Sequence, residues 1–358
     1  MKVPFENIFI DATKTVEKIP QTEYLPSGKY PIIDQGQRHV TGYSNHSTGF
    51  CSDVPAIIFG DHTRVIKYIN KPFFIGADGV KVLKSKSNDT DYKYLFYALN
   101  SIKIPNTGYN RHFKWLKESK IPVYNSTIQK QIAERLDKVQ ELIAKQKEQI
   151  AKLDLLIKSR FLDMFGDPVT NLKKWEIKTL KDLGDVMSGG TPSRSIPRYF
   201  GGDINWFSAG ELNSLFLYRS LETITEEGLL YSNAKLFPAG SLLIGMYDTA
   251  AFKLGILKQQ AAFNQACAAI FPKVVKVVWV YYVLSLLKQE VLKFRRGIRQ
   301  KNLNLQFIRN VKVPVPPLNL QTQFVNFVKS VEQQKEVFST RLSHLEVLYK
   351  SLMQEYFG

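Results

Sequence analysis

The sequence predicts an α+β protein that is a pseudo-two-fold tandem repeat. Two mixed, mainly β domains are separated by two long α-helices that pair as an antiparallel coiled coil. Three observations predict this fold: the middle of the chain repeats its end, two long segments carry an apolar period of 3.5, and short β-rich runs precede each segment. At 358 residues the chain is long enough for two domains with real cores.

The repeat is visible in the residues FLDMFG at 161–166, which resemble the chain's last residues, MQEYFG. The same ungapped register places Ile121–Val123 on Val313–Val315, and Phe165-Gly166 on Phe357-Gly358. Two unrelated amphipathic helices would not also align these proline-containing lead-ins. The chain is therefore interpreted as an internal duplication.

Two long helices follow from the apolar spacing. No Pro or Gly lies between Ile128 and Phe165, and apolar residues recur there in alternating steps of four and three. This is the period of a coiled-coil seam, and the helix would be a rod of roughly 55 Å. The predicted seam residues are Ile132, Leu136, Val139, Ile143, Ile150, Leu153, Ile157, Phe324, Val328, Val331, Phe338, Leu342, Leu345 and Tyr349. Gln146 and Lys335 interrupt the two seams; a helix packed only on its own domain would instead show a broader apolar stripe.

The domain boundaries are set by these helices. We predict a first domain at 1–124, a helix at 125–166, a second domain at 167–316 and a helix at 317–358. Asp167-Pro168 ends the first helix after Gly166, because a residue before proline disfavours the helical conformation. Within the domains, Ala56–Gly60 matches Ser241–Gly245 in pattern, and Tyr94–Leu99 matches Trp279–Leu284.

The charge indicates a polyanionic partner. The chain has 49 Lys and Arg against 32 Asp and Glu, a net charge of +17, and a pI of about 9.6, which favours nucleic acid. Two cysteines, Cys51 and Cys267, form neither a disulfide framework nor a zinc spacing. The most apolar run, Val277–Leu287, is too short for a bilayer, which takes about 20 residues. With no signal-peptide core at the N-terminus, we expect a cytoplasmic protein and no membrane.

Enzymatic motifs are missing from the sequence. It contains no GxxxxGK[ST] loop for a nucleotide-driven motor and no Asn/Asp-Pro-Pro-aromatic motif for an adenine methyltransferase. The five histidines are scattered singly, so no metal cluster forms by spacing. Gly76–Gly79 is better explained as a β-turn than as a cofactor loop. We expect no catalytic residue and no metal site.

Candidate DNA contacts are the loops where basic residues alternate with aromatic and amide residues. Arg and Lys neutralise phosphates, whereas Arg to guanine and Asn or Gln to adenine discriminate bases. The candidates are Gln37, Arg38, His39, Arg64, Lys67, Tyr109, Asn110, Arg111, His112, Thr191, Ser193, Arg194, Arg198, Tyr199, Arg295, Arg296, Arg299, Gln300, Lys301 and Asn302. The sequence leaves open which contact bases and which contact phosphates, and any single Arg could equally be a solvated surface charge. Tyr247-Asp248 and Asn264-Gln265 could line the same face or hydrogen-bond internally.

The residues resemble those of a known family, the specificity (S) subunits of type I restriction–modification systems. Ser188–Ser193 followed by Tyr199–Trp206 is similar to the opening of the family's target-recognition domains. Arg296–Leu303 before Val311–Pro317 resembles the exit from such a domain, and Phe161–Pro168 resembles the junction between helix and second domain. The first domain has no equivalent of Ser-Gly-Gly-Thr-Pro, so its contacts are placed less firmly by the resemblance.

The resemblance implies a non-catalytic, sequence-specific DNA-recognition subunit. Each target-recognition domain would recognise one half of a bipartite, asymmetric site in double-stranded DNA, and the helices would set the gap. Such subunits recruit two adenine-N6 methyltransferase (M) subunits and can also bear motor–nuclease restriction (R) subunits. S-adenosylmethionine and ATP are expected on those partners, and no cofactor on this chain. Two alternatives are the recognition part of a single-chain restriction–methylation enzyme and a non-specific, basic coiled-coil scaffold that binds nucleic acid.

Overall fold

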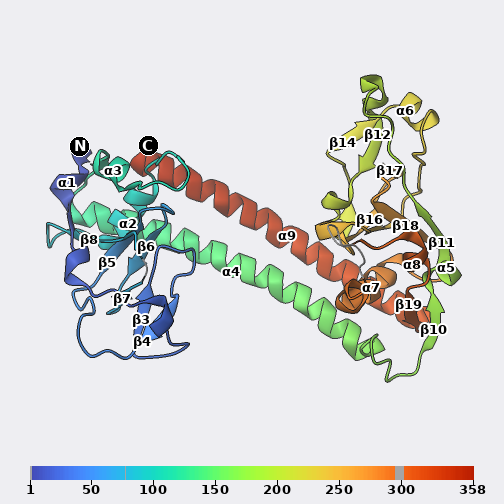
Figure 1. The fold of residues 1–358 in the computed structure, drawn as a ribbon, viewed down its shortest axis with the longest axis horizontal. Coiled ribbons are helices and arrows are strands. Elements are labelled where there is room, and N and C mark those ends of the chain that lie inside the picture. The colour runs from blue at the N-terminus through green and yellow to red at the C-terminus, as the bar shows by residue number, and fades with distance from the viewer. Residues whose placement is uncertain (1, 77, 295–301) are drawn as a thin grey trace. The chain divides into compact units, whose positions relative to one another are not determined.

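The computed structural model describes residues 2–76, 78–294 and 302–358. The chain forms two compact units (Figure 1), each made of one β-rich domain and parts of both long helices. The first unit comprises Met1–Glu148 and Phe338–Gly358, and the second comprises Gln149–Val337. The long helices are α4 (Ser126–Phe165) and α9 (Leu318–Phe357).

The domain of the first unit contains nine strands and three helices in its described residues. They are β1 (Lys2–Pro4), α1 (Phe5–Ile8), β2 (Phe9–Asp11), β3 (Tyr30–Ile33), β4 (Gly42–Ser44), β5 (Ala56–Gly60), β6 (Ile66–Ile69), β7 (Phe74–Ile75), β8 (Val80–Ser85), α2 (Tyr92–Asn100), α3 (Phe113–Lys117) and β9 (Lys120–Pro122). They form a four-stranded sheet in the order β2-β8-β5-β6, a three-stranded sheet β4-β3-β7 and the pair β1-β9.

The domain of the second unit repeats this plan. Its elements are β10 (Glu176–Thr179), α5 (Leu180–Leu183), β11 (Gly184–Ser188), β12 (Phe200–Phe207), β13 (Phe216–Leu217), β14 (Glu222–Ile224), α6 (Glu226–Leu230), β15 (Leu242–Gly245), β16 (Leu254–Leu257), β17 (Ala262–Phe263), β18 (Cys267–Pro272), α7 (Val277–Leu292), α8 (Leu305–Arg309) and β19 (Lys312–Val315). They form the sheets β11-β18-β15-β16-β13 and β14-β12-β17 and the pair β10-β19.

The two strand orders correspond element by element. The strands flanking the centre, β8-β5-β6 and β18-β15-β16, are antiparallel in both units. Each small sheet contains one parallel pair, β3 with β7 and β12 with β17. The duplication and the α+β class predicted from the sequence are therefore confirmed. The second unit adds strand β13 at the edge of its larger sheet.

The central strand of each larger sheet is buried on both faces, which explains its continuous apolar run. In β5, Ile57 and Phe59 face a core that includes α2, while Ala56 and Ile58 face the side of the small sheet with Ile33. In β15 of the second unit, the neighbouring residues Leu242 and Leu243 likewise point to opposite faces of the sheet and belong to two different cores. Each domain is thus layered as helices, larger sheet and small sheet.

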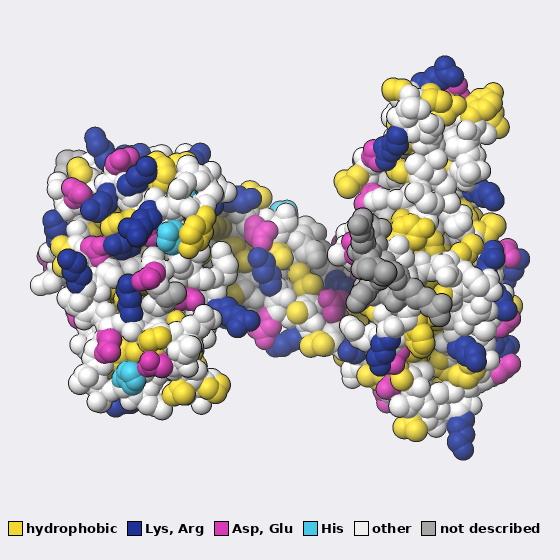
Figure 2. Space-filling model, viewed as in Figure 1, with side chains coloured by type: hydrophobic (Ala, Val, Ile, Leu, Met, Phe, Trp, Pro, Cys, Tyr) yellow, Lys and Arg dark blue, Asp and Glu magenta, His cyan; other side chains and the backbone are white. Residues whose placement is uncertain are grey.

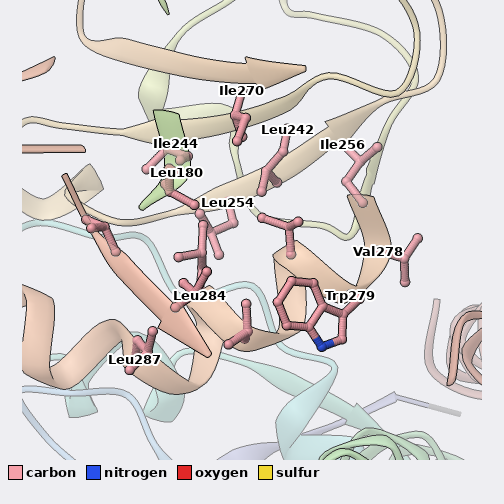
Figure 3. Close-up of a cluster of buried hydrophobic side chains, with 14 of the residues drawn as sticks. Leu180, Leu242, Ile244, Leu254, Ile256, Ile270, Val278, Trp279, Leu284 and Leu287 are labelled. Carbon is pink, nitrogen blue, oxygen red and sulfur yellow. The ribbon is translucent and has the colours of Figure 1, made fainter. Parts of the chain in front are cut away.

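The helix layer of the second unit is centred on α7. Trp279, fully buried, lies beside Leu284 and Val278 and below the strand residues Leu242 and Ile244 (Figure 3). The apolar run that is too short for a bilayer, Val277–Leu287, lies in this helix. A helix forms because the run is longer than a strand and packs one face on a sheet and the other near α9, where Tyr282 meets Phe324.

The long helices run antiparallel within each unit. In the first, Ile132 and Leu136 near the start of α4 share a core with Leu352 and Phe357 near the end of α9. In the second, Phe161 near the end of α4 packs edge-to-face on Phe324 near the start of α9, with ring centroids 5.3 Å apart.

The predicted seam residues are all buried or half-buried. Buried are Ile132, Leu136, Val139, Ile143, Ile157, Phe324, Val328 and Val331; half-buried are Ile150, Leu153, Phe338, Leu342, Leu345 and Tyr349. The polar interruptions behave differently. Lys335 forms ion pairs with Asp154 (2.6 Å) and Glu332 (2.9 Å), whereas Gln146 is buried with its Nε2 unpartnered.

Helix α4 ends at Phe165, and the following glycine caps it. Gly166 has φ +78° and its N–H donates to Leu162 O at 2.8 Å, the geometry of a left-handed C-terminal cap. The Asn171 side chain then donates to the carbonyl of Trp175 and accepts from its N–H. The Trp175 indole N–H donates to Phe165 O at 2.8 Å. The junction is therefore an ordered turn leading into β10.

We predict that Phe161→Ala lowers the free energy of unfolding by about 3–5 kcal/mol, because it empties a ring position that is 1 % exposed. Leu155→Ala is the matched control on the same helix: Leu155 is 65 % exposed and should cost less than about 0.5 kcal/mol. Urea unfolding followed by fluorescence measures both. Equal decreases in the free energy of unfolding for the two variants would show that Phe161 does not stabilise the core.

Candidate nucleic-acid interface

Several loops of the first unit meet at one edge of its sheets. Strands β3 and β7 end side by side at Ile33 and Ile75, and β5 ends where β6 and β8 begin. The loops that leave this edge are 34–41, 61–65 and 76–79, with residue 77 outside the described residues. The segment between α2 and α3, 101–112, joins them. Most of the first unit's predicted contact residues lie on these loops.

Backbone hydrogen bonds centred on Asp61 hold the loops together. The Asp61 N–H donates to Gly79 O (2.7 Å), and the His112 N–H donates to Asp61 O (2.8 Å). The Asp61 carboxylate, buried, accepts from the N–H of Phe113 at 2.7 Å. One short turn therefore fixes both the β7–β8 loop and the end of the α2–α3 segment.

His112 supports this edge from inside and does not face outward. Its ring is fully buried, with Nδ1 2.9 Å from Asp61 O and Nε2 3.4 Å from Thr107 Oγ1. The prediction of direct contact is corrected here: an imidazole without exposed surface cannot touch DNA, and its bonds hold the 101–112 segment instead.

Lys67 is the second corrected contact. Its side chain is buried, and Nζ donates to the carbonyls of Asp34 (2.7 Å) and Arg38 (2.6 Å). Burial lowers the pKa of Lys67, opposed by the neighbouring Asp34 carboxylate. Lys67 therefore shapes the 34–41 loop. Partial desolvation and the Lys67 charge in turn lower the pKa of His39, whose side chain is still exposed to solvent on that loop.

The remaining first-unit candidates are accessible. Gln37, Arg38, His39, Tyr109, Asn110 and Arg111 are exposed. Tyr109, 85 % exposed, stacks on His62 with ring centroids 4.6 Å apart and an interplanar angle of 8°. Arg64 is half-buried, and its guanidinium donates to Ile104 O at 3.4 Å. Lys and Arg side chains spread over the visible face of this unit with fewer acidic groups among them (Figure 2).

The second unit has a corresponding edge. Met246 N–H donates to Ala266 O (2.8 Å), and Leu303 N–H donates to Met246 O (2.7 Å). The Asn302 side chain, half-buried, accepts from Asp248 N–H at 3.0 Å. Thr191 Oγ1 donates to Gln265 Oε1, which brings this predicted contact to the same edge.

Other second-unit candidates are engaged elsewhere. Arg194 forms a bidentate pair with Glu222, both bonds 2.7 Å, and lies over the rings of Phe200 and Trp206. The Arg194 hydrogen bonds lower the pKa of Glu222. Arg198 pairs with Glu227 at 3.0 Å.

Tyr199 is buried and its carbonyl accepts from Thr225, so direct contact by its ring is corrected to a packing role. Ser193 is exposed and bonds Ser195 at 2.8 Å. The predicted contacts Arg295, Arg296, Arg299, Gln300 and Lys301 lie outside the described residues.

The structure places four more exposed or half-exposed residues at these edges: His62, Asp78, Tyr247 and Gln265. For Tyr247 and Gln265 the sequence left open a place on this face or an internal hydrogen bond, whereas His62 and Asp78 were not among the predicted contacts. Gln35 links two of them, because it accepts from His62 N–H (3.1 Å) and donates to Asp78 O (2.9 Å). The match of Ala56–Gly60 to Ser241–Gly245 was the signal that could have found them, since His62 and Tyr247 stand two residues beyond its ends.

Two negative findings concern the described residues. Within 2–76, 78–294 and 302–358, no three His, Cys, Asp or Glu side chains are grouped so as to hold a metal ion. No helix of that same part of the chain is long and apolar enough to span a bilayer.

The duplicated domains with corresponding loop edges, the net charge of +17 and the paired long helices define a class: a two-part nucleic-acid-recognition scaffold. The model of the type I restriction modification DNA specificity domain matches the chain twice, at residues 7–154 and 172–347. The chain therefore belongs to the family of type I restriction–modification DNA specificity subunits.

Similar proteins agree with this assignment. The specificity subunit of the type I restriction enzyme EcoR124I/EcoR124II from Escherichia coli is 27 % identical over 336 residues, covering 86 % of this chain and 82 % of that protein. The MjaIX specificity subunit of Methanocaldococcus jannaschii is 28 % identical over 178 residues, 46 % of this chain and 41 % of that protein.

Solved structures share the fold. The S subunit of a type I restriction–modification system from M. genitalium matches with a TM-score of 0.63 and 20 % identity, over 100 % of this chain and 96 % of that one. A structure solved for the assembly and conformational transition of the type I R-M system matches with a TM-score of 0.56 and 16 % identity, over 98 % of this chain and 97 % of that one.

We predict that His112→Ala destabilises the first unit by about 2 kcal/mol, because it removes a buried ring and its hydrogen bonds. His39→Ala, an exposed histidine on the neighbouring loop, should stay within about 0.5 kcal/mol of wild type. Urea unfolding monitored by tryptophan fluorescence compares them, and Trp115 lies 5.3 Å from the His112 ring as a local reporter. If the two variants were equally stable, His112 would not support the loops.

Proposed function

We propose that this chain is the non-catalytic, DNA-recognising subunit of a type I restriction–modification complex, with each unit recognising one half of a split, asymmetric duplex target. The observation that carries the proposal is the duplicated loop edge. The same backbone scaffold occurs twice, at Asp61 and at Met246, and carries different exposed side chains in the two units. A protein that recognises two unlike half-sites needs this combination of one scaffold and two side-chain sets.

The long helices are proposed to determine the distance between the half-sites. They are the only described segments that contribute to both units, and a continuous α-helix resists bending far more than a loop. Half-site spacing in DNA is a geometric property of the protein that spans it. The gap in the target is then set by helix length.

The same helices and the Ile121–Val123 and Val313–Pro317 lead-ins are proposed to dock two adenine-N6 methyltransferase subunits, and restriction subunits where these are present. Support comes from the family, and from the repeat itself, since two like surfaces suit two like partners. S-adenosylmethionine and ATP would be bound by those partners. The chain itself would catalyse nothing, and methylation by the isolated chain would refute this.

The direct test is to produce the chain with its methyltransferase subunits in a host lacking adenine methylation and to map methyladenine across the genome. We expect one bipartite motif with a fixed gap, absent when this chain is omitted. Methylation without sequence preference, or DNA binding that ignores sequence and vanishes with modest salt, would instead indicate a non-specific basic scaffold.

Helix length gives a second prediction. Inserting one heptad into each helix, after Glu148 and after Val337, keeps the antiparallel register and adds about 10 Å. The methylated motif should keep both half-sites and lose the original gap in favour of a longer one. Inserting the heptad into an exposed domain loop, after Lys71, is the control and should leave the gap unchanged. An unaltered gap in the helix variant would contradict the role of the helices.

A further inference from the structure

The two loop edges are held by the same set of backbone hydrogen bonds. In the first unit these are Gly76 N–H to Ile33 O, Asp61 N–H to Gly79 O and His112 N–H to Asp61 O. In the second unit the corresponding bonds are Asn264 N–H to Phe207 O, Met246 N–H to Ala266 O and Leu303 N–H to Met246 O. We call each set of three bonds the loop frame; all six are 2.7–2.9 Å long.

The loop frame establishes which residues of the two units are equivalent, although their loops differ in sequence. Asp61 corresponds to Met246, Gly79 to Ala266 and His112 to Leu303. Asp61, Met246, His112 and Leu303 are buried and serve the scaffold. The three positions of each loop frame are joined by hydrogen bonds between their backbones. The residues next to them in sequence therefore lie close together at the loop edge.

Three positions in each unit are therefore equivalent and outward-facing. They are the residue after Asp61 or Met246, the residue before Gly79 or Ala266, and the residue before His112 or Leu303. In the first unit they are His62, Asp78 and Arg111; in the second they are Tyr247, Gln265 and Asn302. Asp78, Arg111, Tyr247 and Gln265 are exposed, and His62 and Asn302 are partly exposed.

The first set contains an acidic residue, Asp78, and a basic residue, Arg111, and hydrogen bonds hold the backbone of two of its members in place. The side-chain amide of Gln35 holds the backbone of His62 and Asp78 through two hydrogen bonds, of 3.1 and 2.9 Å. The Asp78 carboxylate, 92 % exposed, pairs through Oδ1 with Lys18 Nζ at 2.7 Å. This hydrogen bond and the charges of Lys18 and Arg111 lower the pKa of Asp78. A guanidinium here suits the O6 and N7 acceptors of guanine, and a carboxylate suits the amino group of cytosine.

The second set is uncharged and its amides are oriented. Asn302 Oδ1 accepts from Asp248 N–H at 3.0 Å, and Gln265 Oε1 accepts from Thr191 Oγ1. The backbone N–H fixes which end of the Asn302 amide is the oxygen, and that oxygen keeps a second lone pair. The Thr191 hydroxyl holds the Gln265 amide in place. A fixed amide that donates and accepts at once matches the N7 and N6 edge of adenine.

Other basic side chains are less suited to base discrimination. The guanidinium of Arg194 forms two hydrogen bonds with Glu222, and the buried Lys67 donates to two backbone carbonyls. These groups are committed to the protein, whereas Arg111 retains an exposed guanidinium.

We propose that His62, Asp78 and Arg111 in the first unit, and Tyr247, Gln265 and Asn302 in the second, determine the bases of the two half-sites. The first set selects guanine–cytosine pairs and the second set selects adenine at the positions they face. This inference rests on the proposed function and assigns the discrimination to six residues.

The test uses the complete chain with its methyltransferase subunits and maps methyladenine for wild type and three variants. The first variant carries the second unit's residues in the first: H62Y, D78Q and R111N. The reciprocal variant carries Y247H, Q265D and N302R. The matched control, K71N with D89Q, removes one positive and one negative charge from exposed positions away from the loop frame of the same unit.

We expect the first variant to change one or two base pairs of one half-site, with at least about a tenfold loss of methylation at the original motif. The other half-site and the gap should not change. The reciprocal variant should alter only the opposite half-site, and the control should keep the wild-type motif. Circular dichroism checks that each variant is folded. If one exchange variant is unfolded, the other exchange variant tests the assignment.

An unchanged motif in a folded exchange variant, or a loss no greater than in the control, would overturn the assignment while the proposed function stands. Changes in both half-sites from one exchange would also overturn it. A wild-type chain that supports no bipartite motif would instead refute the proposed function itself.

Discussion

The hydrogen bonds that join the Asp61 and Met246 turns to their neighbouring loops are the constraint on which the rest of the structure depends. They connect strand ends that are distant in sequence and bring segments with unlike residues to one edge. Backbone bonds do not depend on side-chain identity, so exposed loop residues can change without loss of the scaffold. The two units show this directly, since a buried acid at one position, Asp61, corresponds to a buried methionine, Met246, at the other.

The layers of each domain support that edge. A larger sheet buried on both faces is stiff, because helices cover one face and a small sheet covers the other. The helix layer includes parts of α4 and α9, so each recognition edge is connected through packed side chains to the helices of its own unit. Buried polar groups such as Lys67 and His112 add rigidity where the loops leave the sheets.

The duplication, the long helices and the central strands could be predicted from sequence because each leaves a periodic or repeated signal. Ile132, Leu136 and Phe324 follow the seam period, and Ala56–Gly60 matches Ser241–Gly245. The hydrogen bonds that hold the loop edge together could not be predicted, because they join backbone atoms of residues such as Asp61 and His112, which share no pattern. Residue type alone also gave wrong contact predictions. Lys67 and His112 carry polar groups that normally face water, and only the nearby carbonyls make their burial favourable.

Photo-crosslinking tests the central claim, that the two loop edges contact different halves of one target, most directly. A photoreactive amino acid would replace either His62 or Tyr247 in the complete complex bound to the mapped target, and the crosslinked base pairs would be sequenced. The account predicts that His62 labels one half-site only and Tyr247 labels the other only, with the gap free of both. Crosslinks from both positions to the same half-site, or to no base of the target, would contradict it.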